Sequence, residues 1–380
     1  MKRFLSVILS ITLVMALVTG CSGVATSGSS APASPNGSSP ASAAVSTSAT
    51  TAAISAATTT TPEASPSGTV ASSATTQAAT PSAAYPTPSK EPSANAPVVY
   101  MTKAITPEGL MAIYKALGMK ATGKVAVKLA TGEPPASNYL RPELIKDLVQ
   151  SLDATIVECN TAYGGQRAST AMHMQVAKDH GFTAIADVDI MDSEGEVSLP
   201  VVGGELMKEN VVGSHFKNYD FFVVLSHFKG HMMAGYGGAL KNISIGIASP
   251  AGKSLIHTGT SRTNPFGGDQ DSFLKRMAEA GKSVVDSLNG KILYINVMNR
   301  LSIDCDCNGN PAEPDMHDVG ILASLDPVAL DQACIDIVAT DPDGKSLMDR
   351  LNSRNGLLTL EHAAEIGLGS REYKLVSIDD

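Results

Sequence analysis

A long segment of small and polar residues limits where this chain can fold. Residues 22–97 consist almost entirely of Ala, Ser, Thr, Pro and Gly, with three charged side chains and one aromatic ring among them. Such a segment has too little apolar surface to offset the entropy lost on folding, so we predict that it is disordered. A core can therefore form only in residues 98–380. These 283 residues suffice for one large core or two smaller lobes.

The residues before this segment have the pattern of a lipoprotein signal peptide. Two basic residues are followed by an apolar run, Phe4–Val18, that is too short to span a bilayer. Small residues then lead to Cys21, as in the box where a cysteine is lipidated after cleavage. We expect residues 1–20 to be removed and the lipid on Cys21 to anchor the chain in the cell membrane. Residues 21–97 would then tether the domain at the extracytoplasmic face, after export of the unfolded chain.

The domain that follows is acidic. The net charge is −9 overall, and residues 1–97 contribute +1 from three basic and two acidic side chains, so residues 98–380 carry −10. An acidic domain without a basic cluster is not expected to bind nucleic acid.

Apolar runs alternate with helical patterns along the domain. The predicted strands are Lys124–Ala130, Ala154–Cys159, Phe182–Val188, Tyr219–Leu225, Lys291–Val297 and Val319–Ala323. The predicted helices are Pro142–Leu152, Ala168–His180, Asp271–Leu288 and Pro327–Val338, with a further one near Ala239. This alternation indicates an α/β fold with a largely parallel sheet and flanking helices, as one or two lobes. Ligands of such sheets bind at the carboxyl ends of the strands.

The densest group of chemically active side chains follows the strand that ends at Leu225. Residues 226–242 contain His227, His231 and Lys241 among four glycines. Histidine can bind a metal or transfer a proton near neutral pH, and a lysine at a helix start can hold an anion or form a covalent bond. Glycines let the backbone approach a ligand, and the N–H groups of the following helix would point at an anion. The alternative is that the histidines only pack beside a tight turn.

A second candidate follows the strand that ends at Cys159. The turn at residues 163–167 has two glycines and Arg167 before a helix. This arrangement predicts a cradle for a carboxylate or phosphate, although glycine pairs after strands are often simple turns.

A third group lies at residues 304–318. Cys305 and Cys307, flanked by carboxylates, could bind a transition metal as thiolates. Alternatively, Asp304, Asp306, Asn308 and Asp315 match positions 1, 3, 5 and 12 of a calcium loop. In an exported protein, an acidic loop with one disulfide explains the same residues.

Two of these segments resemble a known family. Residues 226–242, together with residues 304–331 and 360–369, are similar to the family called domain of unknown function 362. Many of its members carry an inserted ferredoxin module with cysteine quartets for iron–sulfur clusters. This chain has no cysteine between Cys159 and Cys305, so no such cluster is expected.

A more distant resemblance concerns the nickel-pincer lactate racemases. The spacing His231-x3-Gly235-Tyr-x-Gly238-x2-Lys241-x15-His257 is similar to a stretch of those enzymes. The resemblance implies that His231 is an acid/base and that Lys241 anchors the pincer nucleotide beside Gly235 and Gly238. It also implies that His257 binds nickel.

Two features depart from that pattern. The turn at residues 160–167 lacks the second acid/base histidine of the racemases. The pincer cofactor is assembled in the cytoplasm, whereas this chain is expected to cross the membrane unfolded. A related site with another metal or cofactor is therefore preferred.

Two functions follow as hypotheses. The first is a metal- or cofactor-dependent enzyme, racemase-like or oxidoreductase-like, acting on a small anionic substrate. His231 and Lys241 would be catalytic, and Arg167, Gly235, Gly238 and Lys241 would bind the cofactor. The metal candidates are His227, His257, Cys305 and Cys307. The second is a lipid-anchored binding protein that captures an anion or a metal ion without chemistry. An enzyme is expected to bury Lys241 near the histidines, and a scaffold to leave it in solvent.

Overall fold

The computed structural model describes residues 92–379, which belong to one compact unit. The predicted signal peptide and Cys21 lie outside the described residues, as does most of the tether. None of the helices within residues 92–379 has the length and apolar character that crossing a bilayer requires.

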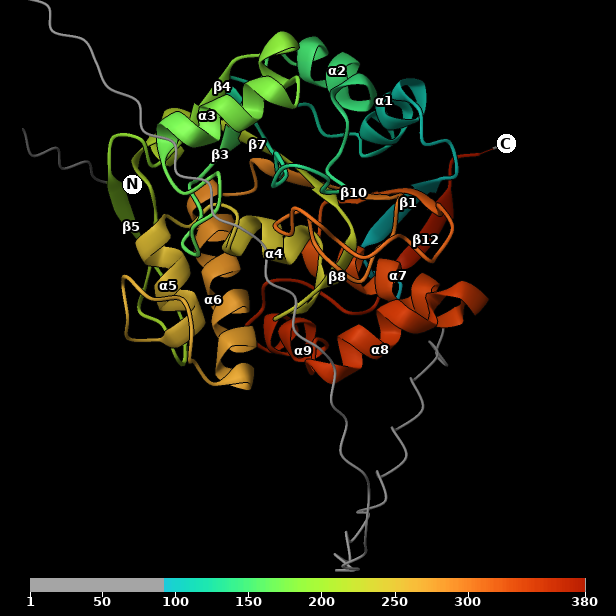
Figure 1. The fold of residues 1–380 in the computed structure, drawn as a ribbon. Helices are drawn as coiled ribbons and strands as arrows, with labels where there is room; N and C mark the ends of the chain where they lie inside the picture. The colour runs from blue at the N-terminus through green and yellow to red at the C-terminus, as the bar shows by residue number, and fades with distance from the viewer. Residues whose placement is uncertain (1–91, 380) are drawn as a thin grey trace, which may run out of the picture. The chain divides into compact units, whose positions relative to one another are not determined.

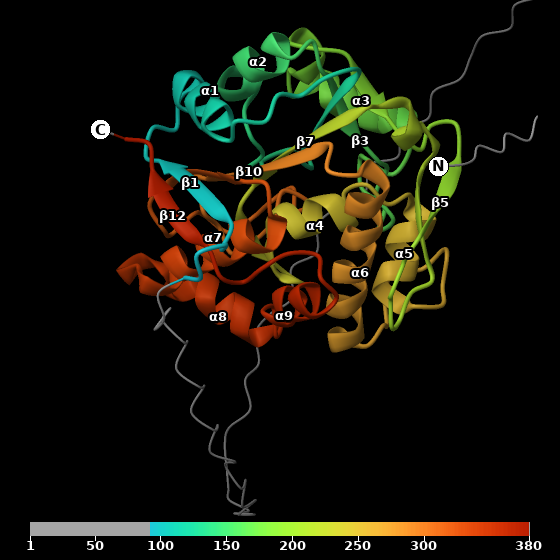
Figure 2. The same cartoon turned by 180° about the vertical axis from the view of Figure 1, so that it is seen from behind.

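An eight-stranded sheet runs through the described residues in the order β12-β1-β11-β10-β7-β2-β3-β4 (Figures 1 and 2). Its strands are β1 (Val98–Thr102), β2 (Val125–Lys128), β3 (Thr155–Glu158), β4 (Val188–Ile190), β7 (Phe221–His227), β10 (Ile292–Met298), β11 (Gly320–Ser324) and β12 (Lys374–Ser377). Only β11 is antiparallel to its neighbours within this sheet of described residues, and all other pairs are parallel. The predicted α/β fold with a largely parallel sheet is confirmed.

Helices cover both faces of the sheet, as Figures 1 and 2 show. One face carries α1 (Pro107–Ala116), α2 (Pro142–Ser151) and α3 (Thr170–Asp179). On the other face α4 (Ala239–Ser244) and α7 (Pro327–Thr340) contact the central strands. Beside them pack α5 (Pro250–Thr258), α6 (Gln270–Leu288), α8 (Lys345–Ser353) and α9 (Leu358–Glu365). Two small antiparallel sheets complete this side, namely β5 (Glu196–Pro200) with β6 (Glu209–Gly213) and β8 (Lys229–His231) with β9 (Gly235–Gly237).

The pleat of the central strands determines which side chains face α4. In β7, Val223 and Leu225 join the core under α1 and α2, whereas Phe222 and Val224 join the core under α4 and α7. Successive side chains of a strand point to opposite faces, so Ser226 continues toward α4. In β2, Ala126 joins the same core under α4 and α7, so Lys128, two residues later, points to that face as well. Polar side chains at the strand ends thus point into the helical layer that holds the candidate site.

One predicted strand forms differently. Phe182 is fully buried in a short 3-10 helix, Phe182–Ala184, and β4 begins only at Val188. Gly181 has φ +85°, a left-handed conformation that ends α3 and starts this turn. The N–H of Ile185 donates to the carbonyl of Phe182 at 3.1 Å, so local hydrogen bonds replace those of a strand.

Candidate functional site

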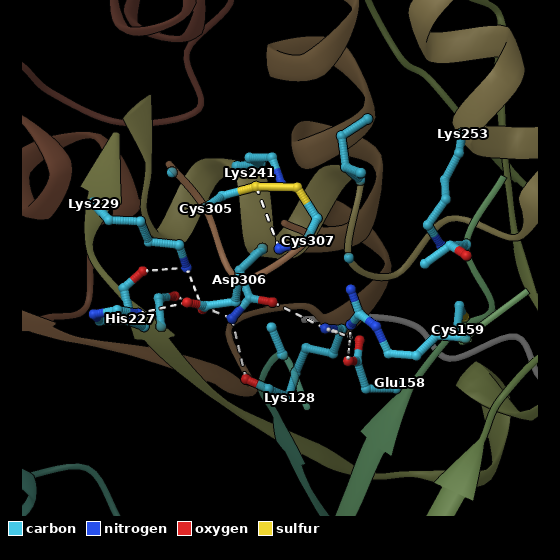
Figure 3. A pocket seen from close by; sticks show the side chains of 18 of the residues that line it. Lys128, Glu158, Cys159, His227, Lys229, Lys241, Lys253, Cys305, Asp306 and Cys307 are labelled. Atoms are coloured by element: carbon cyan, nitrogen blue, oxygen red, sulfur yellow. Dashed lines mark hydrogen bonds and ion pairs between the residues drawn. A yellow bond between two sulfur atoms is a disulfide. The ribbon is translucent and has the colours of Figure 1, made fainter. Parts of the chain in front are cut away.

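The carboxyl ends of β2, β3 and β7 open onto a cavity of about 100 Å³, shown from close by in Figure 3. Its walls also include α4, the β8–β9 hairpin and the loop of residues 305–307. Among residues 92–379, the lining contains five basic side chains and two carboxylates: Lys128, Arg167, Lys229, Lys241 and Lys253, with Glu158 and Asp306. An excess of positive charge within an acidic protein creates a local potential that attracts anions. The cavity therefore suits a small anionic ligand.

Glu158, at the end of β3, is the centre of one buried group of charges. Its carboxylate accepts hydrogen bonds from Lys128 Nζ at 3.1 Å, Arg167 Nη1 at 3.3 Å and the Thr131 N–H at 2.8 Å. Burial raises the pKa of Glu158, but Lys128, His173 and Arg167 outweigh it and hold the pKa well below its ordinary value. Glu158 is therefore a fixed anion that orients the cations on this wall.

The turn before α3 already holds a carboxylate of the protein itself. Glu133 accepts from the Gln166 N–H and, at 3.0 Å, from Arg167 Nε. A Cβ on Gly165, which has φ +80°, would lie 2.5 Å from a Glu133 oxygen. The predicted anion cradle is thus formed, but Glu133 occupies it. Arg167 still lines the cavity.

His227 and Lys229 form a second buried group with Asp306. His227 Nδ1 lies 2.9 Å from Asp306 Oδ1, and Lys229 Nζ donates to Asp306 Oδ2 at 2.7 Å. His227 Nε2 donates to the carbonyl of Asn299 at 2.6 Å, because a carbonyl can only accept. Both nitrogens of His227 are therefore engaged. Burial raises the pKa of Asp306, but His227 and Lys229 outweigh it and lower the pKa far below its ordinary value.

Lys241 differs from the other cavity cations. Lys128, Arg167, Lys229 and Lys253 each donate to an acceptor of the protein. Within residues 92–379, Lys241 Nζ makes no hydrogen bond or ion pair, although it lines the cavity and is only partly exposed. Burial and repulsion from Lys229 lower the pKa of Lys241 to about 7. A large share of this amine is therefore neutral at neutral pH.

His231 lies behind a disulfide in the cavity wall. Cys305 and Cys307 are bonded to each other, and His231 Nε2 is 4.0 Å from Cys307 Sγ. His231 Nδ1 accepts from the N–H groups of Met233 at 3.2 Å and Ala234 at 2.9 Å, so the proton of the neutral ring is on Nε2. Burial and the charge of Lys241 hold the pKa of His231 well below its ordinary value. His231 is thus a neutral N–H donor that faces sulfur.

The predicted metal residues are not brought together as a set. The ligand atoms of His231, Cys305 and Cys307 lie within 4.8 Å of one another, a grouping that includes neither His227 nor His257 among the described residues. Metal binding there requires free thiolates in place of the disulfide. The His257 ring stacks on Phe273 with centroids 4.3 Å apart, and His257 is not among the residues that line the cavity. Burial lowers the pKa of His257 to about 3.

The residues of the predicted calcium loop are bonded to other groups of the protein. Asp304 pairs with Arg350 at 3.2 Å, and Asp315 accepts from Ser346 at 2.8 Å. Asp306 pairs with Lys229. The three carboxylates do not form a group within 4.8 Å of one another among the described residues. Asn308 donates to Asp304 at 3.4 Å, and its side-chain oxygen accepts from the Asn310 N–H at 2.9 Å. The carboxylates that match the calcium-loop spacing therefore do not surround a common point in this structure.

The start of α4 is capped by the protein and is not open to a ligand. The N–H groups of Ala239 and Leu240 donate to the Asp331 carboxylate of α7 at 2.8 and 2.9 Å. A Cβ on Gly238 would lie 2.3 Å from Asp331 Oδ1, so this glycine makes room for that carboxylate. Gly235 packs against α8, with Leu351 within 3.1 Å of the position of a Cβ. Neither glycine therefore needs a cofactor to explain it.

Sequence reasoning missed several residues of the site. Lys128 and Glu158 end two short, largely apolar strands, VAVK and TIVE. A charged residue in a buried strand is costly unless it is paired, so this pattern was a usable signal. Glu133, Lys253 and Asp331 gave no such signal, because their partners are distant in sequence.

Comparisons with known proteins place the chain in a family. The family described as domain of unknown function (DUF362) matches residues 125–336. No curated protein matches the chain. A solved structure of the lactate racemase apoprotein from Thermoanaerobacterium thermosaccharolyticum is similar with 19% identity and a TM-score of 0.34, over 53% of this chain and 50% of that one. A protein from Thermotoga maritima is similar with 13% identity and a TM-score of 0.35, over 70% and 59%. The chain thus spans half to three fifths of these structures.

Proposed function

The chain belongs to the family described as domain of unknown function (DUF362), and we propose that its domain is an enzyme acting on a small anionic substrate. The supporting observation is the Lys241 amine, which lines a cationic cavity without an acceptor among the described residues. A buried amine beside other cations is a recognised way to activate lysine as a nucleophile. We also propose that a lipid on Cys21 holds this domain at the extracytoplasmic face of the membrane.

The cavity has spare donors for the anionic group of a substrate. Arg167 has five N–H groups, and three hydrogen bonds to Glu133, Glu158 and Tyr163 leave two free. Lys253 uses one of its three N–H groups on the carbonyl of Ala248. These donors are held in place by their bonds to the protein. They suit a carboxylate.

A small carboxylate with an adjacent carbonyl, a 2-oxo acid, suits both features. The lone pair of Lys241 Nζ would form a bond to the carbonyl carbon. The carbonyl oxygen would leave as water with the two protons of the amine, and an imine would remain. Such an imine withdraws electrons from the neighbouring carbon and so favours proton removal there, which is racemase- or isomerase-like chemistry.

The nickel-pincer group implied by the racemase resemblance does not fit these residues. Of the three residues that would serve it, Lys241 alone lines the cavity within the described chain. His231 donates toward a disulfide, and His257 is stacked on Phe273.

The imine can be trapped chemically. The full mature chain is incubated with pyruvate and sodium borohydride, and the modified lysine is located by peptide mass spectrometry. We expect the adduct on Lys241 and its loss in Lys241→Arg, which keeps a charge but has no neutral amine. Lys282→Arg, on α6 outside the cavity lining, is the control and should keep the adduct on Lys241. An adduct spread equally over surface lysines would refute the role of Lys241. Pyruvate binding by calorimetry without any adduct would instead support the non-catalytic binding protein.

A further inference from the structure

The disulfide of Cys305 and Cys307 occupies an unusual place for a stabilising bond. It forms part of the cavity wall, and it joins residues only two apart in sequence (Figure 3). The stabilisation given by a disulfide grows with the length of the loop it closes, so this bond constrains very little of the unfolded chain. The other described cysteines, Cys159 and Cys334, are free and buried. The bond therefore calls for an explanation other than fold stability.

The two sulfurs have different surroundings. Cys305 is 5% exposed, whereas Cys307 is partly exposed on the cavity side. The N–H of Cys307 donates to Cys305 Sγ at 3.4 Å. The N–H at His231 Nε2 lies beside both sulfurs, since all three ligand atoms are within 4.8 Å of one another. N–H donors stabilise a thiolate, and a stabilised thiolate is a better leaving group.

The orientation of His231 is fixed for this role. Its Nδ1 accepts two backbone N–H groups, so its Nε2 carries the proton that faces the sulfurs. The cavity that the sulfurs line also carries the cations Lys128, Arg167 and Lys229. An approaching thiolate would meet a positive potential, an accessible sulfur and a leaving group with donors already in place.

We propose that the Cys305–Cys307 disulfide is a thiol–disulfide exchange site that reacts with a small anionic thiol entering the cavity. The incoming thiolate attacks Cys307 Sγ, the Cys305–Cys307 bond breaks, and its electron pair passes to Cys305 Sγ. A second thiol of the same class attacks the mixed disulfide at its outer sulfur and frees Cys307. The protein gains two electrons and two protons, and the two small thiols leave as one disulfide. A small disulfide reverses the reaction.

The cavity predicts which thiol reacts fastest. The probes are 2-mercaptoethanesulfonate, 2-mercaptoethanol and cysteamine, which are similar in size and carry negative, zero and positive charge. The full mature chain in its oxidised form is mixed with each probe at equal thiolate concentration. Free thiols are alkylated at intervals, and the peptide containing residues 305–307 is quantified by mass spectrometry. We expect the anionic probe to react about 10-fold faster than the cationic one at low salt, with the difference fading at high salt.

Variants test the assigned roles. Cys305→Ser should hold a stable mixed disulfide on Cys307. His231→Ala should slow exchange about 10-fold. His257→Ala removes a partly buried histidine outside the group and should leave the exchange rate unchanged. Equal rates for the three probes at low salt would overturn the proposal, as would equal rates in the two histidine variants. A bond that stays oxidised in every probe would also overturn it. Imine trapping at Lys241 does not involve these sulfurs, so the two proposals fail separately.

Discussion

At neutral pH the Lys241 amine should react with a neutral acylating reagent while surface lysines stay almost inert. An ordinary lysine has a pKa near 10.4, so less than about 0.1% of it is neutral at pH 7. Burial and repulsion from Lys229 lower the pKa of Lys241 to about 7, so roughly half of it is neutral there. Competitive labelling with acetic anhydride over a range of pH, read by peptide mass spectrometry, measures this midpoint. The exposed Lys120 on the same chain is the internal reference for reagent reactivity.

The same assay tests the electrostatic cause. Lys229→Met removes a positive charge that repels protonated Lys241, so the labelling midpoint of Lys241 should move to higher pH. Lys282→Met, which removes a charge paired with Asp286 on α6 outside the cavity lining, should leave the midpoint unchanged. A wild-type midpoint near pH 10 would show that water reaches the amine freely, and the reasoning about the cavity would then be wrong.

Three further predictions concern stability, metal and anchoring. The pKa of Lys241 is lower in the folded protein than in the unfolded chain, so the unfolded chain binds more protons between about pH 7 and pH 10, and stability rises with pH across that window. Lys241→Met should therefore raise the free energy of unfolding by up to about 5 kcal/mol at pH 6 and by under about 1 kcal/mol at pH 10 in urea titrations; equal gains would contradict this. Elemental analysis should find about one zinc ion per chain only after reduction of Cys305 and Cys307, with His257→Ala as an unaffected control; zinc in the oxidised protein would contradict it. Cys21→Ser should leave the membrane pellet and appear in the soluble fraction, and retention in the pellet would exclude a lipid anchor.

Local pattern was sufficient for the main elements of the fold. The predicted segment Ala154–Cys159 contains β3, and Lys291–Val297 covers all of β10 except its last residue, Met298. Asp271–Leu288 matches α6 within one residue. These elements have a clear apolar period and distinct ends. The strand predicted at Phe182–Val188 was wrong, because its apolar residues can equally be buried in a 3-10 turn. The left-handed Gly181 and the hydrogen bonds that follow it favour the turn over the strand.

The candidate site was less predictable, because its chemistry depends on partners far apart in the chain. Spacing alone identified Lys241 and Arg167, which do line the cavity. It did not reveal that Glu133 fills the cradle beside Arg167, or that Lys229 takes the Asp306 carboxylate. Those pairs join residues 34 and 77 positions apart. A sequence motif identifies possible hydrogen-bond donors, but only the folded structure shows which of them are free to bind a ligand.

The cap that Asp331 places on α4 makes two distant stretches of the chain interdependent. Within the described part of the chain, the residues that line the cavity all precede position 308, yet the backbone turn that carries Lys241 is positioned by a carboxylate from α7. Grafting the cavity segment into a relative without this aspartate would transfer the reactive amine but not its placement. A functional transplant would need the opening turns of α4 and the middle of α7 to move together.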